Sequence, residues 1–351
     1  MRIVVGLPGT ADVGYVESLR SAGADEFFVG YVPAAWHRKL GFEVSPNRRY
    51  RRGQQVTDAG HLAELCAAAA PCPVAVTLNE HIIGSGAWAG PARALMGEAV
   101  EAGVKAAVVA GPGAALLLAR EFPGLSLHMS GDGGVYNAAA GRFLAGLGVR
   151  RLIFPRELPF ADLAAVGEAL SGTGLELEAF VMGEPCVYDG ARCFTEHGYG
   201  FSCDFCNHHS VRHVVERGRD GMTALPPAGA GEPEGRREAE ALRLGKCGLC
   251  AIPYLSRVRV THIKVPGRAS VALPAVRLVR AVLSVLEGDA VAGVPGGGVK
   301  SGPGHERESR RRAERVAREL LGAPRLCAEG RFCYFPELRE MLVATTEGAE
   351  E

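Results

Sequence analysis

Six of the ten cysteines in the chain lie between residues 186 and 250. They form one C-x6-C pair and two C-x2-C pairs: Cys186 and Cys193, Cys203 and Cys206, Cys247 and Cys250. Thiolates bind iron–sulfur clusters and zinc, and two thiolates separated by two residues can chelate one centre from a tight loop. In a chain of this length, clustered cysteines indicate metal binding rather than a disulfide framework. The spacing therefore predicts a four-thiolate iron–sulfur cluster, with zinc as the alternative.

The other four cysteines lie outside this stretch. Cys66 and Cys72 belong to an Ala-rich helical segment, where a free cysteine behaves as a small hydrophobic side chain, so we expect both to be buried. Cys327 and Cys333 form a C-x5-C pair near the end of the chain, and that spacing does not choose between packing and metal binding. Three histidines beside the cluster are expected to be solvated, with metal ligation as the alternative: His197, His208 and His209.

Alternating strands and helices must position these residues. Short apolar runs rich in β-branched residues predict eight strands, at Ile3–Leu7, Glu26–Val29, Val74–Leu78, Ala106–Val109, Leu125–Met129, Leu152–Phe154, Leu177–Met182 and Ile263–Val265. Amphipathic stretches between them predict helices at His61–Ala69, Ala92–Ala102, Asn137–Leu147 and Ala161–Leu170. This alternation indicates a parallel sheet.

A weak internal repeat favours one parallel architecture. Gly23, Gly103 and Gly148 each stand just before an apolar run, where glycine suits the left-handed position that follows a helix. Eight strands built from one repeating strand–helix unit favour a (β/α)8 TIM-barrel-like fold over an open doubly wound sheet. No G-x-G-x-x-G segment follows the first strand, which disfavours dinucleotide binding.

In such a barrel the chemistry gathers at the carboxyl ends of the strands. The candidates at these ends are Asn79, Glu80 and His81 after the third run, His128 and Ser130 at the fifth, Arg156 and Glu157 after the sixth, Glu184 and Cys186 after the seventh, and Lys264 and Arg268 at the eighth. We expect part of this polar rim to cap helices or form ion pairs that order loops, and part to contact a substrate.

The connection between the seventh and eighth runs is much longer than an ordinary strand–helix unit. It covers residues 183–260, carries the six clustered cysteines and contains a Gly- and Pro-rich middle. We therefore expect a barrel domain over residues 1–290 with a cysteine-bearing insertion at 183–260. A helical tail is expected over residues 291–351, with a charged, solvated helix at His305–Leu321.

The overall composition limits the partners. The 39 Lys and Arg residues balance the 39 Asp and Glu residues, so bulk electrostatic capture of nucleic acid or of an anionic membrane is disfavoured. Nucleic-acid binding is not excluded, because a local basic groove is compatible with zero net charge. No apolar run is long enough for a membrane span, and the N-terminus predicts a strand rather than a secretory signal. We expect a cytoplasmic protein.

Several separated motifs, in the same order, resemble the collagenase-like peptidase family U-32, in the short form similar to the anaerobic ubiquinone-biosynthesis iron–sulfur proteins. Gly23-Ala24-Asp25-Glu26 is similar to the family's first "GAD" segment, and Arg156-Glu157-Leu158 to its "REL" segment. Cys186 with Gly190-Ala191-Arg192-Cys193 resembles "C-x4-GRC", with Ala191 in place of glycine. The segment from His262 to Arg268 is similar to "LKIEGR", with Pro266 in place of glutamate.

The resemblance implies a barrel-like catalytic domain with a [4Fe–4S] cluster. The implied ligands are Cys186, Cys193, Cys203 and Cys250, with Cys206 and Cys247 as alternates. It also implies oxygen-independent hydroxylation of a small molecule or quinone, as in ubiquinone biosynthesis, or of an RNA base. Some members of the family are associated with prephenate as the oxygen donor.

Residue roles follow from this resemblance and from the predicted rim. We expect Arg156, Lys264 and Arg268 to hold a carboxylate-bearing donor through charge-assisted hydrogen bonds, and Glu157 to transfer a proton. Asn79 and His128 are expected substrate contacts. The alternatives are a non-catalytic iron–sulfur or zinc subunit in a heterodimer with a related U-32 protein, and a peptidase.

Overall fold

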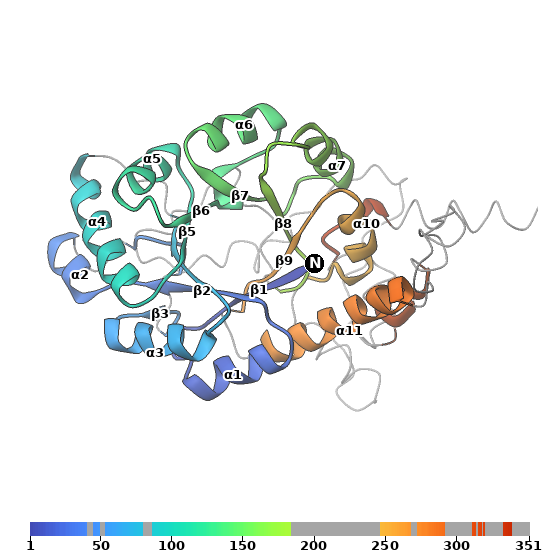
Figure 1. The fold of residues 1–351 in the computed structure, drawn as a ribbon, viewed down its shortest axis with the longest axis horizontal. Helices are drawn as coiled ribbons and strands as arrows, with labels where there is room; N and C mark the ends of the chain where they lie inside the picture. Colours follow the sequence, from blue (N-terminus) through green and yellow to red (C-terminus); the bar gives the residue numbers. More distant parts are fainter. Residues whose placement is uncertain are drawn as a thin grey trace, which may run out of the picture.

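The computed structural model describes residues 1–40, 45–49, 53–79, 86–183, 246–267, 272–291 and 333–338, together with 311–313, 315–317 and 319. Eight parallel strands form its centre: β1 (Arg2–Gly6), β2 (Glu26–Tyr31), β4 (Val74–Leu78), β5 (Ala106–Val109), β6 (Ser126–Met129), β7 (Val149–Ile153), β8 (Glu176–Phe180) and β9 (His262–Val265). Neighbouring strands pair in this order, and β1 pairs with both β2 and β9, so the sheet closes into a barrel (Figure 1). The predicted (β/α)8 fold is confirmed, and each predicted apolar run overlaps a barrel strand.

Helices surround the ring on its outside (Figure 1). They are α1 (Val13–Ser21), α2 (Ala34–Leu40), α3 (Ala59–Ala69), α4 (Gly86–Glu101), α5 (Pro112–Glu121), α6 (Ala138–Gly146), α7 (Phe160–Ala169), α10 (Ile252–Arg257) and α11 (Ala272–Val291), with 3-10 turns η1 (Gly131–Gly133) and η4 (Leu249–Ala251). The four predicted helices are confirmed as α3, α4, α6 and α7. Aliphatic side chains on the outer face of the strands pack against these helices and form the core.

Some elements were not predicted from the sequence. Among them are α1, α2, α5, α10, α11 and the two-residue strand β3 (Gln55–Val56), which pairs with β2. For α5 the physical reason is clear: Gly111 stands at the N-cap and Pro112 is the first helical residue, a position where proline stabilises a helix start.

The repeated glycines behave as expected. Gly23, Gly103 and Gly148 have φ angles of 102°, 102° and 94°, in the left-handed region, and each lies between the end of a helix and the start of the next strand. Three helices also start at side-chain caps, because Asp12, Asp58 and Asn137 accept backbone hydrogen bonds from the first turn. These local signals set the length of the repeating unit.

In the tail, residues 311–313, 315–317 and 319 are helical, and all fall within the predicted helix His305–Leu321. The proposed division into residues 1–290 and 291–351 stays a prediction. None of the helices in the described ranges has the length and apolar character needed to cross a membrane.

The inside of the barrel holds charged side chains, where many barrels hold aliphatic ones. Every second residue of a strand faces inward, so β8 contributes Glu176 and Glu178, and β9 contributes His262 and Lys264. Arg151 of β7 reaches across the ring, and its Nη1 lies 2.7 Å from Glu26 Oε2 and 3.1 Å from Glu178 Oε2.

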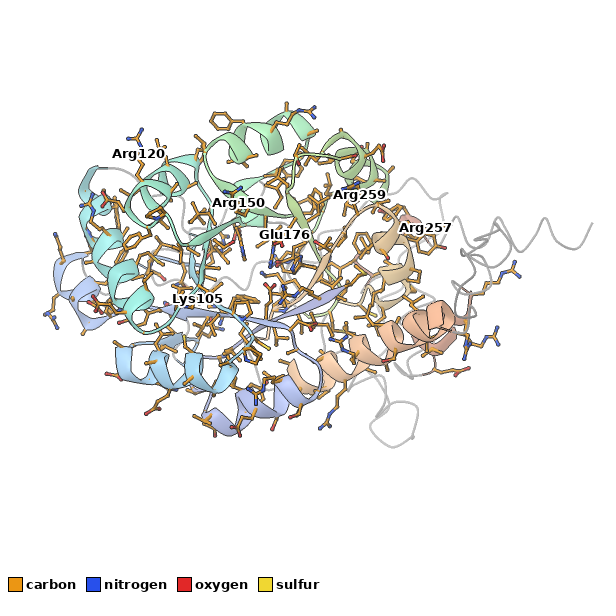
Figure 2. The ribbon with its side chains drawn as sticks, viewed as in Figure 1. Lys105, Arg120, Arg150, Glu176, Arg257 and Arg259 are labelled. Atoms are coloured by element: carbon orange, nitrogen blue, oxygen red, sulfur yellow. The ribbon has the colours of Figure 1, made fainter. Side chains whose placement is uncertain are left out.

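The network reaches both ends of the barrel. Lys264 Nζ lies 2.7 Å from Glu178 Oε1, and His262 Nε2 lies 3.2 Å from Glu26 Oε1. Glu176, half-exposed at the amino-terminal mouth of the barrel (Figure 2), also pairs with Arg151. Opposite charges are therefore interleaved along the interior, which offsets the cost of burying them.

Burial and these partners shift the protonation of the interior groups. Burial alone would raise the pKa of Glu178, but Lys264 and Arg151 outweigh it and lower that pKa to about 2. Burial lowers the pKa of His128, which lies inside the ring on β6, to about 3. At neutral pH the interior therefore contains a charged carboxylate and an uncharged imidazole.

We expect the barrel to lose stability as the pH falls from about 6.5 towards 3, because the unfolded chain binds more protons than the folded chain in this pH range. His128 adds to this loss of stability once the pH falls below about 6.5, and Glu178 adds to it once the pH falls below about 4.5. Urea unfolding across this range should show a weaker pH dependence for His128→Gln than for the wild type. His61→Gln on α3, outside the ring, is the control. Equal pH dependence of wild type and His128→Gln would contradict the assignment.

A close backbone approach at the top of β1 gives a second test. A Cβ atom on Gly6 would lie 1.8 Å from the carbonyl oxygen of Pro266, whereas a Cβ on Gly97 of α4 would meet no heavy atom within 4 Å. We expect Gly6→Ala to lower the free energy of unfolding by about 1–3 kcal/mol, since two strand ends must move apart. Gly97→Ala should be neutral or stabilising by up to about 1 kcal/mol. Thermal unfolding of both variants measures the difference.

Candidate functional site

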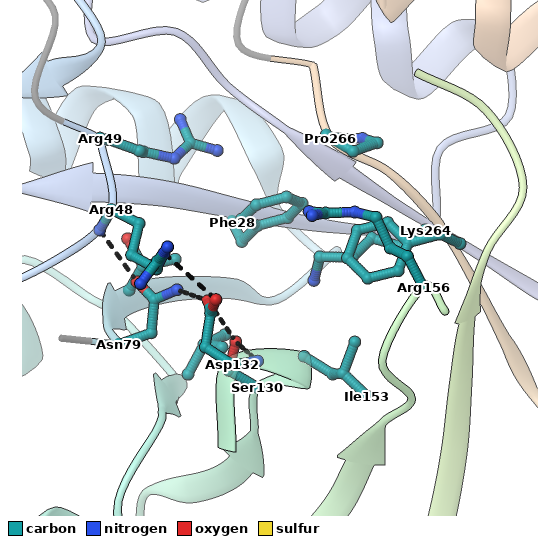
Figure 3. A pocket seen from close by; sticks show the side chains of 13 residues that line it. Phe28, Arg48, Arg49, Asn79, Ser130, Asp132, Ile153, Arg156, Lys264 and Pro266 are labelled. Atoms are coloured by element: carbon teal, nitrogen blue, oxygen red, sulfur yellow. Dashed lines mark hydrogen bonds and ion pairs between the residues drawn. The ribbon is translucent and has the colours of Figure 1, made fainter. Parts of the chain in front are cut away.

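A pocket opens at the carboxyl ends of the barrel strands, where the fold predicts a site. It encloses about 460 Å³ of space, counting the part open to solvent. Its walls come from most of the barrel strands and the loops after them: Phe28, Arg48, Arg49, Thr77, Asn79, Val108, Ser130, Asp132, Ile153, Arg156, Phe180, Lys264 and Pro266 (Figure 3). The residues that line the site are thus spread along the sequence from Phe28 to Pro266.

Basic side chains outnumber acidic ones among the described lining residues. These are Arg48, Arg49, Arg156 and Lys264, against Asp132. Guanidinium groups bind carboxylate and phosphate oxygens through paired, charge-assisted hydrogen bonds. The lining therefore suits a small anionic ligand.

Asp132 organises one wall of the pocket. Its Oδ1 lies 3.2 Å from Arg48 Nε, and its Oδ2 accepts hydrogen bonds from Asn79 Nδ2 at 2.6 Å and from Ser130 Oγ at 3.0 Å (Figure 3). Burial would raise the pKa of Asp132, but Arg48 and Arg156 outweigh it and the pKa is lowered. Asp132 is therefore ionised and fixes the side chains of Arg48 and Asn79.

Two aromatic rings, Phe28 and Phe180, also line the pocket. The Cζ atom of Arg156 lies 4.3 Å from the centroid of Phe180, and Lys264 Nζ lies 3.9 Å from the centroid of Phe28. The Cζ atom of Arg49 lies 5.0 Å from the same Phe28 ring. These cation–π contacts hold the basic groups in place and provide apolar surface for a ligand.

Arg48 and Arg49 were missed by the sequence analysis. They lie in a short segment, residues 45–49, that Gln55 of β3 holds in place: Gln55 Oε1 accepts from Asn47 Nδ2 at 2.8 Å, and Gln55 Nε2 donates to Ser45 Oγ at 3.1 Å. The available signal was the arginine-rich sequence N-R-R-Y-R-R that follows the second strand. It was overlooked because no periodic element contains it.

The predicted site residues have different positions. Asn79, Arg156 and Lys264 line the pocket. His128 lies deeper, inside the ring, where its Nε2 is 3.1 Å from Ser126 Oγ. Glu157 Oε1 accepts a hydrogen bond from the Tyr136 hydroxyl at 2.5 Å. Arg268, like Glu80, His81 and Glu184, falls outside the described residues.

Of the cysteines between residues 186 and 250, only Cys247 and Cys250 are described. Cys247 forms isolated backbone bridges with Met182, just after β8, and with Cys333 of the tail. Cys247 and Cys250 of one segment and Cys333 of the distant tail therefore belong to segments that meet next to the end of β8. Cys186, Cys193, Cys203, Cys206 and Cys327 lie outside the described residues, as do His197, His208 and His209. Within the ranges that the structure describes, no group of three or more His, Cys, Asp or Glu side chains forms a metal site.

The tail connects the cysteine region to the pocket. Tyr334, next to Cys333, stacks on Phe180 with ring centroids 6.2 Å apart, and its hydroxyl donates to the Gly183 carbonyl. Glu337 accepts a hydrogen bond from Phe160 N at the start of α7. One aromatic layer, Tyr334 against Phe180, thus links the thiol-bearing strands to the pocket wall.

Cys66 and Cys72 are only half-buried and pack against the core. Burial raises the pKa of the Cys66 thiol to about 11. A thiol with a raised pKa is a poor nucleophile and a poor metal ligand at neutral pH. Cys66 and Cys72 therefore pack against the core as expected, but the prediction that both are buried is wrong, because each stays partly exposed.

Fold and pocket together define a (β/α)8 barrel protein with a basic pocket at the carboxyl ends of its strands. The sequence matches the profile of peptidase family U32 over residues 13–293, and the chain belongs to this family. The resemblance that the motifs indicated is thereby confirmed.

Curated relatives match over a shorter stretch. They are the tRNA hydroxylation protein P of Haemophilus influenzae, 31% identical over 88 residues, and that of Escherichia coli, 30% identical over 94 residues. The matches cover 25% and 27% of this chain and 19% and 20% of the relatives. The chain thus aligns with about a fifth of the length of these relatives.

Solved structures align with the chain at low similarity. The U32 peptidase Mk0906 has a TM-score of 0.40 and 15% identity, covering 52% of this chain and 69% of that protein. Phosphoribosyl anthranilate isomerase from Thermus thermophilus has a TM-score of 0.41 and 10% identity, covering 81% of this chain and 100% of that protein. At this level of similarity neither structure supports an argument about function.

The Asp132 wall makes a quantitative test possible. Asp132→Asn removes the charge that balances Arg48 in a buried position, so we expect it to lower the free energy of unfolding by about 3 kcal/mol. Glu121→Gln is the matched control, because it breaks the exposed Arg93–Glu121 pair of 2.9 Å and should cost less than about 1 kcal/mol. Urea unfolding at neutral pH compares the two. Similar losses in both variants would show that Asp132 does not organise the pocket wall.

Proposed function

We propose that the chain is an iron–sulfur protein that carries out oxygen-independent hydroxylation. The observation that carries the proposal is the match to proteins named for tRNA hydroxylation within the same family. It is supported by the six cysteines in the sequence between β8 and β9. The basic pocket at that mouth provides a place for a small anionic co-substrate.

The donor set suits a [4Fe–4S] cluster, because the cysteine spacings supply four thiolates with two in reserve. We propose Cys186, Cys193, Cys203 and Cys250 as the ligands, with Cys206 and Cys247 as alternates. The backbone bridge between Cys247 and Met182 supports a position of this segment next to the end of β8. Such a cluster would supply electron transfer; zinc is the alternative metal.

The pocket residues would bind the oxygen donor. Arg48 and Arg156 would hold its carboxylate, and Asn79, fixed by Asp132, would donate or accept a further hydrogen bond. In the overall reaction a C–H bond of the acceptor becomes C–OH, while the donor gives up a hydroxyl group and takes the hydrogen. The acceptor is thereby oxidised by two electrons and the donor reduced by two, so that molecular oxygen is not needed.

The acceptor is a small ring compound, a quinone or an RNA base. The names of the curated relatives favour a tRNA base. The zero net charge of the chain argues against tight, purely electrostatic RNA binding, so a partner subunit of the same family would help to hold a large acceptor.

Metal content tests this proposal directly. Protein purified without oxygen should be brown and contain about four irons per chain, and Cys186→Ala, Cys193→Ala and Cys250→Ala should each lose iron and the visible absorption. Cys66→Ala, on α3 away from the barrel mouth, is the matched control and should keep both. Comparing hydroxylated bases in tRNA from anaerobic cells with and without the protein then tests the acceptor.

The outcomes separate the alternatives. Colourless protein that holds zinc would overturn the cluster and support a structural module in a heterodimer. Proteolytic activity that survives Cys186→Ala would support a peptidase. Iron-containing protein whose absence leaves tRNA unchanged would move the acceptor to a small molecule or quinone.

A further inference from the structure

Lys264 is one of the residues that line the pocket. It projects from β9 and lies between two aromatic rings, with its Nζ atom 3.9 Å from the centroid of Phe28 and 5.9 Å from that of Phe180. The residue is only 5% exposed, yet it lines the pocket. Figure 3 shows Lys264 and Arg156 both reaching towards the pocket beside Phe28.

The charge of Lys264 is already balanced. Glu178, fully buried below it, lies 2.7 Å from Nζ, so the ammonium adds little positive charge to the pocket. The three arginines of the lining already offer hydrogen-bond donors for an anion, although Asp132 balances the charge of Arg48. What Lys264 adds to this lining is a primary amine.

The composition of the chain strengthens this point. Only five of its 39 basic residues are lysines, namely Lys39, Lys105, Lys246, Lys264 and Lys300, and the other 34 are arginines. A guanidinium keeps its proton in proteins and is not a nucleophile, whereas a buried amine can lose its proton and attack a carbonyl carbon. A lysine at this position, in a chain that otherwise uses arginine, points to amine chemistry.

We infer that Lys264 forms a reversible imine with a 2-oxo acid bound in the pocket. The ketone carbon of such an acid matches the amine, and its carboxylate matches the guanidinium groups of Arg48 and Arg156. The inference rests on the proposed use of this pocket for a small anion, and it names the chemical class of that anion.

The step balances without any further reactant. The ammonium of Lys264 passes one proton to pocket water, and the free amine attacks the carbonyl carbon. The C=O bond is replaced by C=N. The oxygen takes up one proton from the nitrogen and the proton released in the first step, and leaves as water, so that R–NH3⁺ and the ketone become a protonated imine and one water. Glu178 then pairs with the iminium cation as it did with the ammonium.

The local electrostatics support this role. Burial lowers the pKa of Lys264, and the positive charges of Arg151 and Arg49 act in the same direction, against the opposing effect of Glu178. The aromatic rings exclude water from one side of the amine, which favours the dehydrated imine. These conditions make the amine more available at neutral pH than an exposed lysine.

Reductive trapping tests the inference on the full chain. The protein is incubated anaerobically with pyruvate and sodium cyanoborohydride, which reduces imines, and then digested and analysed by mass spectrometry. We expect a reduced pyruvate adduct on Lys264 and little on Lys105, which is exposed at the opposite end of β5 from the pocket (Figure 2). Lys105→Arg should leave the adduct unchanged, and Lys264→Arg, which keeps a positive charge beside Glu178, should abolish it.

Two further comparisons keep the test decisive. Acetone, which lacks a carboxylate, should label Lys264 much less than pyruvate does; equal labelling would overturn the assignment of a 2-oxo acid. No adduct on Lys264 in folded wild-type protein, or equal labelling of Lys264 and Lys105 in one sample, would overturn the imine itself, even if Lys264→Arg does not fold. Trapping needs no iron, so a failure of the proposed cluster is distinguishable from a failure of this inference.

Discussion

The structure depends on charge balance inside a closed ring of strands. Glu178 is fully buried, and its carboxylate is met by Lys264 at 2.7 Å and by Arg151 at 3.1 Å. Removing either partner would leave an uncompensated charge where water does not reach, at a cost of about 3–5 kcal/mol. Because Arg151 also pairs with Glu26, strands β2, β7, β8 and β9 are joined by one network that can be changed only as a unit.

This network also determines what the pocket can do. Lys264 belongs to both the charge network and the pocket lining, because its amine lines the pocket while its partner Glu178 lies in the barrel interior. Asp132 plays a similar part on the opposite wall, where it holds Arg48 and Asn79. Side chains fixed in this way lose little conformational freedom when a ligand binds, which favours a specific site on a rigid scaffold. The tail adds a third connection, because Tyr334 joins the wall at Phe180 to the segment of Cys333.

Much of the fold could be predicted because its signals are local. The apolar runs identified all eight barrel strands, and Gly23, Gly103 and Gly148 marked the repeating unit. The rule that chemistry gathers at the carboxyl ends of barrel strands then selected Asn79, Arg156 and Lys264, which line the pocket. Short elements such as β3 and α2 were not predicted, because segments of two and seven residues show too little periodicity.

The sequence by itself determined the strand order, the family and the set of thiols, because each depends on spacing along the chain. Only the tertiary structure decided which charges meet. Arg151 and Glu26 are 125 residues apart, and no local pattern pairs them. The same holds for Arg48 with Asp132 and for Cys333 with Cys247. The position of Cys333 in the sequence had not assigned it a role. Closing the ring brings these residues together, and contacts of that kind arise from the path of the chain in space rather than from periodicity.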